Sequence, residues 1–307
     1  MITAALLALC TVAGQPPLTP GTTALLVGRD DDGYRSELQR AIASPDPIVR
    51  AVAARVAGVR HQGDMAGPLR AALAAETDPI ATREQQEAIA RLERGAAAPD
   101  AGTAVPATQT VRTFQSIAPG VLSSLMAAAG CKPARPGAAG SARITFDASG
   151  AVLRSEIDTS GLPAKCHQVL STMARLAVAG EATSGVHAEY LLLPVDTDFV
   201  KCSDQSAADT PAGPPGGKLV PPRKTRDVRP AYPPGALAAG DSGVVWVVAH
   251  VTRSGCINDA RVTRSLRPDL DVAAIRAVVG FGYEPARLGD TPVSSFVTTS
   301  VNFQIQR

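Results

Sequence analysis

The alternation of apolar and polar residues is clearest near the end of the chain. Residues 244–251 (VVWVVAHV) are apolar on both faces, which predicts a central strand of a sheet. Thr252–Gly255 predicts a hairpin turn, and residues 256–264 predict the returning strand. From Leu270 to Phe281 the apolar residues recur at helical spacing, which predicts a helix that covers one face of the sheet.

The last predicted strand runs from Ser295 to Ile305 and alternates with a period of two. Its inward side is apolar and its outward side is polar. The inward residues are Val297, Val301, Phe303 and Ile305, and the outward ones are Thr298, Ser300, Asn302 and Gln304. Together with a short helix after Tyr232-Pro233, these elements predict an α-β-β-α-β unit over residues 223–307.

The middle of the chain repeats this pattern at a constant offset of 105 residues. Residues 142–146 align with 247–251, and Ser149-Gly150 aligns with Ser254-Gly255. Both segments predict a strand, a glycine turn, a second strand and a helix. We therefore interpret residues 110–202 as a divergent copy of the C-terminal unit, so that the chain has the α+β fold class.

The first part, residues 34–94, has the apolar spacing of amphipathic helices. Asp46-Pro47 recurs as Asp78-Pro79 after 32 residues. Aspartate is a good helix N-cap and proline is favoured at the first helical position, so each pair predicts a helix start. A helix pair with this period resembles a HEAT-type repeat, although a plain helical hairpin or three-helix cluster also accounts for the pattern.

Two segments rich in small residues and proline predict linkers, at residues 95–109 and 203–222. The first 15 residues are apolar but shorter than a spanning helix, which needs about 20. They are interpreted as a signal peptide, with a short membrane anchor or lipidation at Cys10 as the alternatives.

The composition excludes several classes of function. A net charge of +2 without a basic block does not favour nucleic-acid binding. Catalytic serine, phosphate-loop and zinc-protease motifs are missing from the sequence, so no catalytic residue, metal ligand or cofactor is predicted. Cys131, Cys166, Cys202 and Cys256 are compatible with two disulfides or with buried thiols.

The ordered features of residues 223–307 resemble the TonB C-terminal domain family. A Tyr-Pro pair opens a short helix, glycines precede the first strand and close the hairpin, and an aromatic-rich element ends in Pro-Ala before the last strand. The residues that carry the resemblance are Tyr232, Pro233, Gly243, Gly255, Pro285, Ala286 and Phe303. Tyr232 and Trp246 are expected to serve mainly in core packing.

The resemblance implies a non-catalytic periplasmic protein that binds an outer-membrane transporter, by adding a segment of the partner to a sheet edge. The candidate edge is Ser295–Ile305, with Thr298, Ser300, Asn302 and Gln304 as the partner-binding residues. Energy transduction from the inner membrane is one role that this implies. A cell-envelope adaptor without energy coupling is the alternative, since helical repeats precede the domain here.

The resemblance also implies a pairing for two of the cysteines. In the family-like topology the third strand of the middle unit returns beside its first strand. Cys202 would end the third strand and Cys131 precedes the first. A Cys131–Cys202 disulfide is therefore predicted, and Cys166 and Cys256 are left unassigned.

Overall fold

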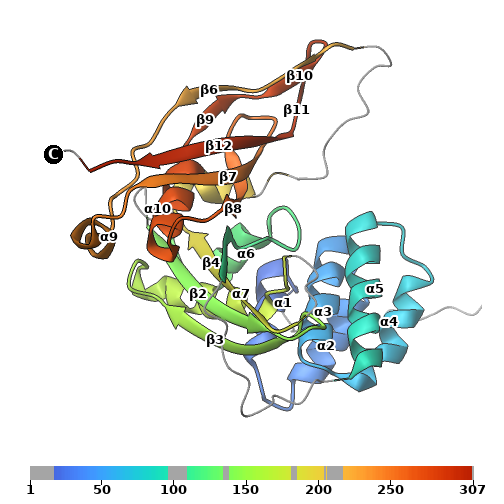
Figure 1. Cartoon of the computed structure of the whole chain (residues 1–307). Coiled ribbons are helices and arrows are strands. Elements are labelled where there is room, and N and C mark those ends of the chain that lie inside the picture. The colour runs from blue at the N-terminus through green and yellow to red at the C-terminus, as the bar shows by residue number, and fades with distance from the viewer. Residues whose placement is uncertain are drawn as a thin grey trace, which may run out of the picture.

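A computed structural model describes residues 17–95, 109–133, 138–180, 185–203, 205 and 217–305. The predicted signal peptide or anchor, residues 1–15, lies outside the described residues. So do residues 96–108 of the first predicted linker and residues 204 and 206–216 of the second. In Figure 1 the C-terminal unit (orange to red) lies above the middle unit (green to yellow), and the helical region (blue to cyan) lies beside the middle unit.

The N-terminal part of the described chain is helical, as predicted. Its helices are α1 (Pro20–Leu25), α2 (Tyr34–Ile42), α3 (Pro47–Val59), α4 (Ala66–Leu73) and α5 (Pro79–Arg94), with 3₁₀ turns η1 (Leu26–Gly28) and η2 (Gly63–Met65). Helices α3 and α5 lie side by side (Figure 1). Buried alanine and valine side chains fill the space between them, which allows close packing with few aromatic residues.

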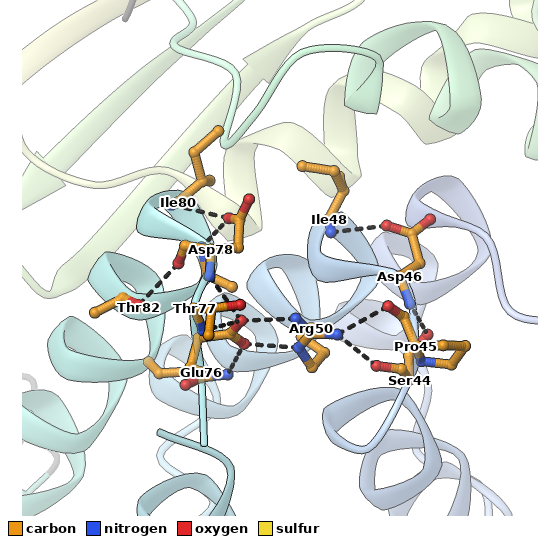
Figure 2. A network of polar contacts seen from close by, with 12 residues as sticks. Ser44, Pro45, Asp46, Ile48, Arg50, Glu76, Thr77, Asp78, Ile80 and Thr82 are labelled. Carbon is orange, nitrogen blue, oxygen red and sulfur yellow. Dashed lines mark hydrogen bonds and ion pairs between the residues drawn. The ribbon is translucent and has the colours of Figure 1, made fainter. Parts of the chain in front are cut away.

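Both predicted Asp-Pro helix starts are present and are joined by one arginine (Figure 2). The carboxylate of Asp46 accepts hydrogen bonds from Ile48 N and Val49 N, and Asp78 does the same at the start of α5. The Arg50 guanidinium then forms two 2.6 Å hydrogen bonds to Glu76, just before the second cap. The third nitrogen of Arg50 donates to the carbonyl of Ser44, 2.7 Å away. Ser44 lies just before Asp46, the first cap. The two helix starts are thus tied to one another.

The strands form one large sheet and two small ones. The strands are β1 (Gln109–Thr113), β2 (Ala139–Phe146), β3 (Val152–Asp158), β4 (His187–Pro194), β5 (Leu219–Val220), β6 (Arg223–Arg226), β7 (Gly243–Val251), β8 (Ile257–Arg264), β9 (Gly282–Glu284), β10 (Ala286–Leu288), β11 (Thr291–Val293) and β12 (Ser295–Phe303). Seven of them form a sheet in the order β12-β7-β8-β1-β4-β2-β3. Strands β5, β10 and β11 form a second sheet, and β6 pairs with β9.

The middle and C-terminal units share a hairpin, a helix and a strand that returns beside the first strand of the hairpin. The remaining helices are α6 (Val121–Ala128), α7 (His167–Leu176), α8 (Thr197–Ser203), α9 (Pro234–Ala239) and α10 (Pro268–Val279), and η3 (Ala164–Cys166) is a 3₁₀ turn. In the middle unit the hairpin β2-β3 is followed by α7 and then by β4, which pairs with β2. In the C-terminal unit β7-β8 is followed by α10, by the short strands β9, β10 and β11, and then by β12, which pairs with β7. The hairpin glycines, Gly150 and Gly255, have φ of 80° and 81°.

Strand β1 joins these two units into one sheet. It pairs in parallel with β4 over its whole length and antiparallel with β8 through Arg112 and Arg261. The buried Arg112 guanidinium forms an ion pair with the buried Glu189 of β4 and donates to the carbonyl of Val178. On the other side, the Thr113 hydroxyl donates to Asp259 and accepts from Ala260 N.

The helices of the two units lie on opposite faces of the shared sheet. Alternate residues of β4 belong to different cores: Leu191 and Leu193 pack with α7 and the helical region, whereas Leu192 packs with α10. Because side chains alternate along a strand, α7 and α10 must cover different faces. The face of β7 and β12 that turns away from α10 is therefore the one that α7 covers in the middle unit.

The helical region shares its core with the middle unit. Gly21 of α1 lies so close to α6 that a Cβ there would be 2.1 Å from the Ser124 carbonyl oxygen, and its N–H donates to the Ser124 hydroxyl. Further along, Arg55 of α3 pairs with the fully buried Glu84 of α5 and reaches the carbonyl of Leu176 at the end of α7. Two separate contacts thus fix the helical region on the middle unit.

The predicted disulfide Cys131–Cys202 is wrong. The structure pairs Cys131 with Cys166 and Cys202 with Cys256. Cys202 does not end the third strand, because β4 stops at Pro194 and the chain forms α8, which packs on β8 beside Cys256. Cys131 follows α6 and meets the start of α7 instead of the sheet. The second bridge therefore connects the middle unit to the C-terminal unit.

The pairing of Glu76 predicts a stability difference that depends on pH. The Arg50 hydrogen bonds lower the pKa of Glu76 from an ordinary 4.5 to about 2. The pKa of Glu76 is lower in the folded state than in the unfolded state, so its ionised carboxylate stabilises the fold. This stabilisation is complete above pH 4.5 and disappears as the pH falls from 4.5 to 2. We expect Glu76→Gln to lower the free energy of unfolding at pH 6 by on the order of 3 kcal/mol, and the difference from the native chain to vanish near pH 2.

Urea unfolding at several pH values measures this difference. Glu93→Gln is the matched control, because its carboxylate is 57% exposed and pairs with an equally exposed Arg70. Its effect should stay below about 1 kcal/mol at every pH. A Glu76→Gln effect that does not change between pH 6 and pH 2 would contradict the assignment.

The disulfide pairing can be mapped without reduction. Trypsin cleavage after Lys201, Lys218, Arg253 and Arg261 releases peptides 202–218 and 254–261. Mass spectrometry of the unreduced digest should find these two peptides joined, and should find peptide 166–175 joined to the one that carries Cys131. Reduction should separate both pairs. A species that joins Cys131 to peptide 202–218 would contradict the structure.

Candidate functional site

The last strand, β12, forms one end of the seven-stranded sheet. It pairs antiparallel with β7 from Ser295 opposite Val251 to Phe303 opposite Gly243. No other strand within the described residues pairs with the opposite side of β12. Its outer backbone groups therefore have the geometry that can receive an extended segment.

Three of the four predicted partner-binding residues lie on one face of β12, and Gln304 follows the end of the strand. Thr298, Ser300, Asn302 and Gln304 are all exposed, whereas Val301 and Phe303 are 4% and 1% exposed. Residues that pair directly across two strands share a face, so Thr298, Ser300 and Asn302 lie beside Val248, Trp246 and Val244 of β7. We call this surface the outer face. Its role in binding stays a prediction.

The outer face also carries apolar side chains that the sequence analysis did not assign to it. Phe296 is 70% exposed and its ring lies 4.9 Å from that of His250. Trp246 is 38% exposed and Val244 is 37% exposed, so the expectation that Trp246 serves mainly in core packing is wrong. Phe296 has the same parity as Thr298 and Ser300, and this alternation was the signal that could have located it.

Tyr232 behaves as predicted and supports the inner side of the site. Its ring contacts Phe303 edge-on at a centroid distance of 5.5 Å, and its hydroxyl donates to the carbonyl of Asp241. Pro233 is the N-cap of α9, which ends at Gly240 in the left-handed conformation. The Tyr-Pro pair therefore holds the segment before β7 against the end of β12.

The hairpin glycine of the C-terminal unit is packed against the Pro-Ala element. A Cβ on Gly255 would lie 1.8 Å from the Tyr283 carbonyl oxygen and 3.6 Å from Pro285 Cδ, and the Tyr283 N–H donates to the Gly255 carbonyl. Ala286, the next residue, is 1% exposed. These family-type residues bring the β7-β8 turn against the segment that leads to β12.

The buried Asp271 and the partly buried Tyr283 support the same unit. Burial raises the pKa of the Asp271 carboxyl, although hydrogen bonds from the Ser265 hydroxyl and Leu266 N oppose the shift. This carboxylate holds the loop before α10. Burial likewise raises the pKa of Tyr283, whose hydroxyl interacts with Thr299 on the inward side of β12.

The other strand edges of the large sheet differ from β12. The outer edge of β4, which corresponds in topology to that of β12, is occupied by β1. At the far end, β3 exposes the charged residues Arg154, Glu156 and Asp158, which disfavour the addition of another strand. Within the described residues, β12 is thus the edge that is both open and rich in neutral side chains.

Metal clusters, a Cys-His pair and membrane-spanning helices are not apparent in the described part of the chain. There, no three His, Cys, Asp or Glu side chains gather as metal ligands would. Cys166 is bonded to Cys131 and does not form a unit with His167. A search of the described helices finds none with the length and apolar character needed to span a bilayer.

The comparison with known proteins agrees with the geometry of the C-terminal unit. Residues 228–305 match the family described as the Gram-negative bacterial TonB protein C-terminal. Protein tonB2 of Pseudomonas aeruginosa is a relative that is 34% identical over 77 residues, which cover 25% of this chain and 28% of the relative. The chain thus spans little more than a quarter of that relative. The family match begins at residue 228, after β6, and does not extend to the middle unit or the helical region.

The hairpin contact predicts a strong effect of one methyl group. We expect Gly255→Ala to lower the free energy of unfolding by about 3 kcal/mol or more, because it adds a backbone clash to the cost of positive φ. Gly240→Ala is the matched control, since Gly240 has φ of 75° but no atom within 4 Å of its Cβ position. It should cost about 1–2 kcal/mol. Urea unfolding of both variants measures the difference, and equal effects would contradict the contact.

Proposed function

We propose that this chain is a non-catalytic TonB-like protein of the cell envelope, which binds an extended segment of an outer-membrane transporter by strand addition at β12. The single observation that carries the proposal is the open, neutral edge of β12 in a unit that matches the TonB C-terminal family. Thr298, Ser300, Asn302 and Gln304 would then flank the added strand, with Trp246 and Phe296 available for its apolar side chains.

The arrangement of the other edges supports this choice of site. A partner strand at β4 would have to displace β1, together with the buried Arg112–Glu189 pair. Removing one member of a buried ion pair costs about 3–5 kcal/mol. At β12 a partner gains backbone hydrogen bonds and displaces no described element.

Two disulfides support an oxidising compartment. Cytosolic proteins of ordinary bacteria rarely keep such bonds, whereas periplasmic proteins commonly do. We therefore propose that the folded part lies in the periplasm. The N-terminal segment would serve either as a cleaved signal peptide or as an anchor in the inner membrane.

Energy transduction and adaptor function make different demands on the chain. An energy transducer requires a membrane anchor, whereas an adaptor does not. The adaptor role is favoured by the shared core of the helical region and the middle unit, because it makes a wide, fixed surface for other envelope proteins. N-terminal sequencing of the mature protein, combined with membrane fractionation, distinguishes the two: an uncleaved, membrane-bound chain supports transduction.

We further propose that the middle unit is a divergent copy of the C-terminal unit, and that α2–α5 form a HEAT-like pair of repeats. In both units a hairpin is followed by a helix and by a strand that pairs with the first strand of the hairpin, and this shared pairing supports the first proposal. The equivalent aspartate caps at a period of 32 residues support the second.

The proposed binding mode predicts an effect of proline that depends on position. Backbone N–H groups of neighbouring residues in a strand point to opposite sides, so Thr298→Pro and Thr299→Pro together remove one outward donor and one donor that faces β7. The variant that loses the backbone donor on the open edge should stay folded. Its affinity for a synthetic peptide from the periplasmic N-terminus of a transporter of the same organism should fall by about tenfold. Fluorescence titration measures the affinity and circular dichroism monitors the fold.

Alanine at the same two positions is the control, because Thr298→Ala and Thr299→Ala keep the backbone donors. Both should bind within about threefold of the native chain, since each removes only a side-chain contact. If the folded proline variant binds like the native chain, the edge of β12 is not the site. If the native chain binds no transporter peptide, the adaptor role is favoured.

A further inference from the structure

A cleft with converging arginines lies between the helical region and the middle unit, far along the chain from β12. It has two adjoining parts, of about 150 Å³ and about 650 Å³. Arg91 and Arg94 of α5 line both parts, and so does the hairpin turn at Ser149-Gly150. The smaller part is also lined by Arg175 of α7 and by His61, which follows α3.

The lining of the smaller part contains cations and no carboxylate. Among the described residues, Arg94 and Arg175 form no hydrogen bond or ion pair, and Arg91 has only Glu87, at 3.8 Å. The Arg91 side chain is nevertheless 19% exposed, so most of it is removed from water. Burial, and then the neighbouring Arg55, lowers the pKa of Arg91. A guanidinium in this position lacks the full pairing that buried charges require.

His61 adds a second unsatisfied group to this part of the cleft. Its Nδ1 is buried without a hydrogen-bond partner among the described residues. Its backbone has φ of 51°, which is uncommon for a residue other than glycine. Strained backbone and unpartnered polar atoms are enriched at binding sites.

The ordinary explanation of these arginines is that they neutralise helix ends. Helices α3, α5 and α7 all end at the smaller part, and each C-terminus carries about half a negative charge. Together the three ends supply about −1.5 charges, whereas the three guanidinium groups supply three positive ones. Glu87, which pairs with Arg91, removes one more positive charge, so about half a positive charge stays uncompensated at the smaller part, and an anionic group such as a phosphate would neutralise it.

We propose that this cleft binds a small phosphate ester of a polyhydroxy compound, with the phosphate in the smaller part between Arg91, Arg94 and Arg175. A volume of 150 Å³ corresponds to about five water molecules, at about 30 Å³ each, and admits a phosphate group. Guanidinium groups bind phosphate oxygens through paired, charge-assisted hydrogen bonds. The His61 ring lines the same part and can add one contact.

The larger part has the chemistry to hold the hydroxyl groups. It is lined by the carboxylates of Glu87, Asp147 and Asp259 and by the side-chain amides of Gln115 and Asn258. Carboxylate and amide oxygens accept hydrogen bonds from hydroxyl donors. Its volume is within the range of small-molecule sites. Because the lining comes from all three parts of the chain, a bound molecule would contact each of them. This proposal does not depend on strand addition at β12.

Isothermal titration calorimetry of the full chain tests the proposal, with glucose 6-phosphate, inorganic phosphate and glucose as the probes. Glucose 6-phosphate should bind saturably, inorganic phosphate should bind more weakly, and glucose alone should not bind. Arg91→Gln and Arg175→Gln should each lower the affinity for glucose 6-phosphate by about tenfold or more. Arg35→Gln is the matched control: its side chain is 69% exposed on α2, outside both parts of the cleft, and its affinity should stay within about twofold of the native value.

Arg175 is exposed at the end of α7, so its variant keeps the test decisive even if Arg91→Gln does not fold. Absence of saturable binding by either phosphate at millimolar concentration would overturn the proposal. So would native affinity in both folded arginine variants. Equal affinities for glucose 6-phosphate and inorganic phosphate would overturn the assignment of the larger part to hydroxyl groups.

Discussion

The architecture depends on the pairing of five residues, Gln109–Thr113, between two otherwise separate sheets. Strand β1 occupies the edge of β4 and touches β8, so the middle and C-terminal units become one sheet. The buried pair of Arg112 and Glu189 fixes its register, because a shift by one residue would turn the arginine to the opposite face. The same pairing closes the edge of β4 and leaves β12 open.

Local patterns in the sequence were sufficient to predict the elements whose stability is local. Each of these elements depends on residues that are close together in the sequence. They are the two hairpins, the helix faces, the alternation of β12 and the aspartate caps. Strand β1 was not found, because QTVRT is short and polar and its pairing partners lie about 80 and 150 residues away. Helices α1 and α8 were missed for a similar reason: they are short and are stabilised by packing on other parts of the chain.

The two candidate sites also differ in how far they could be predicted from the sequence. The outward residues of β12 could be read from a period of two, and Phe296 belongs to the same series. The arginine cleft could not be predicted, since Arg91 and Arg175 come from helices in different parts of the chain. The disulfide pairing was mispredicted because it depends on where a strand ends. Assigning Cys202 to a strand required β4 to continue to that residue, but the chain turns into α8 after Pro194.

The Cys202–Cys256 bridge has a consequence for how the protein would carry mechanical load. A pull along β12 acts in shear on all nine residue pairs with β7 at once, so the strands would not peel apart pair by pair. From β7 the force passes to β8, and the disulfide beside β8 transmits it to α8 through covalent bonds. This covalent route into α8 does not pass along the backbone between residues 203 and 255. Resistance to such a force is set by the rate of unfolding more than by equilibrium stability. The disulfide beside the loaded β7-β8 hairpin would raise the barrier to unfolding at the point where the force passes from the C-terminal unit to the middle unit.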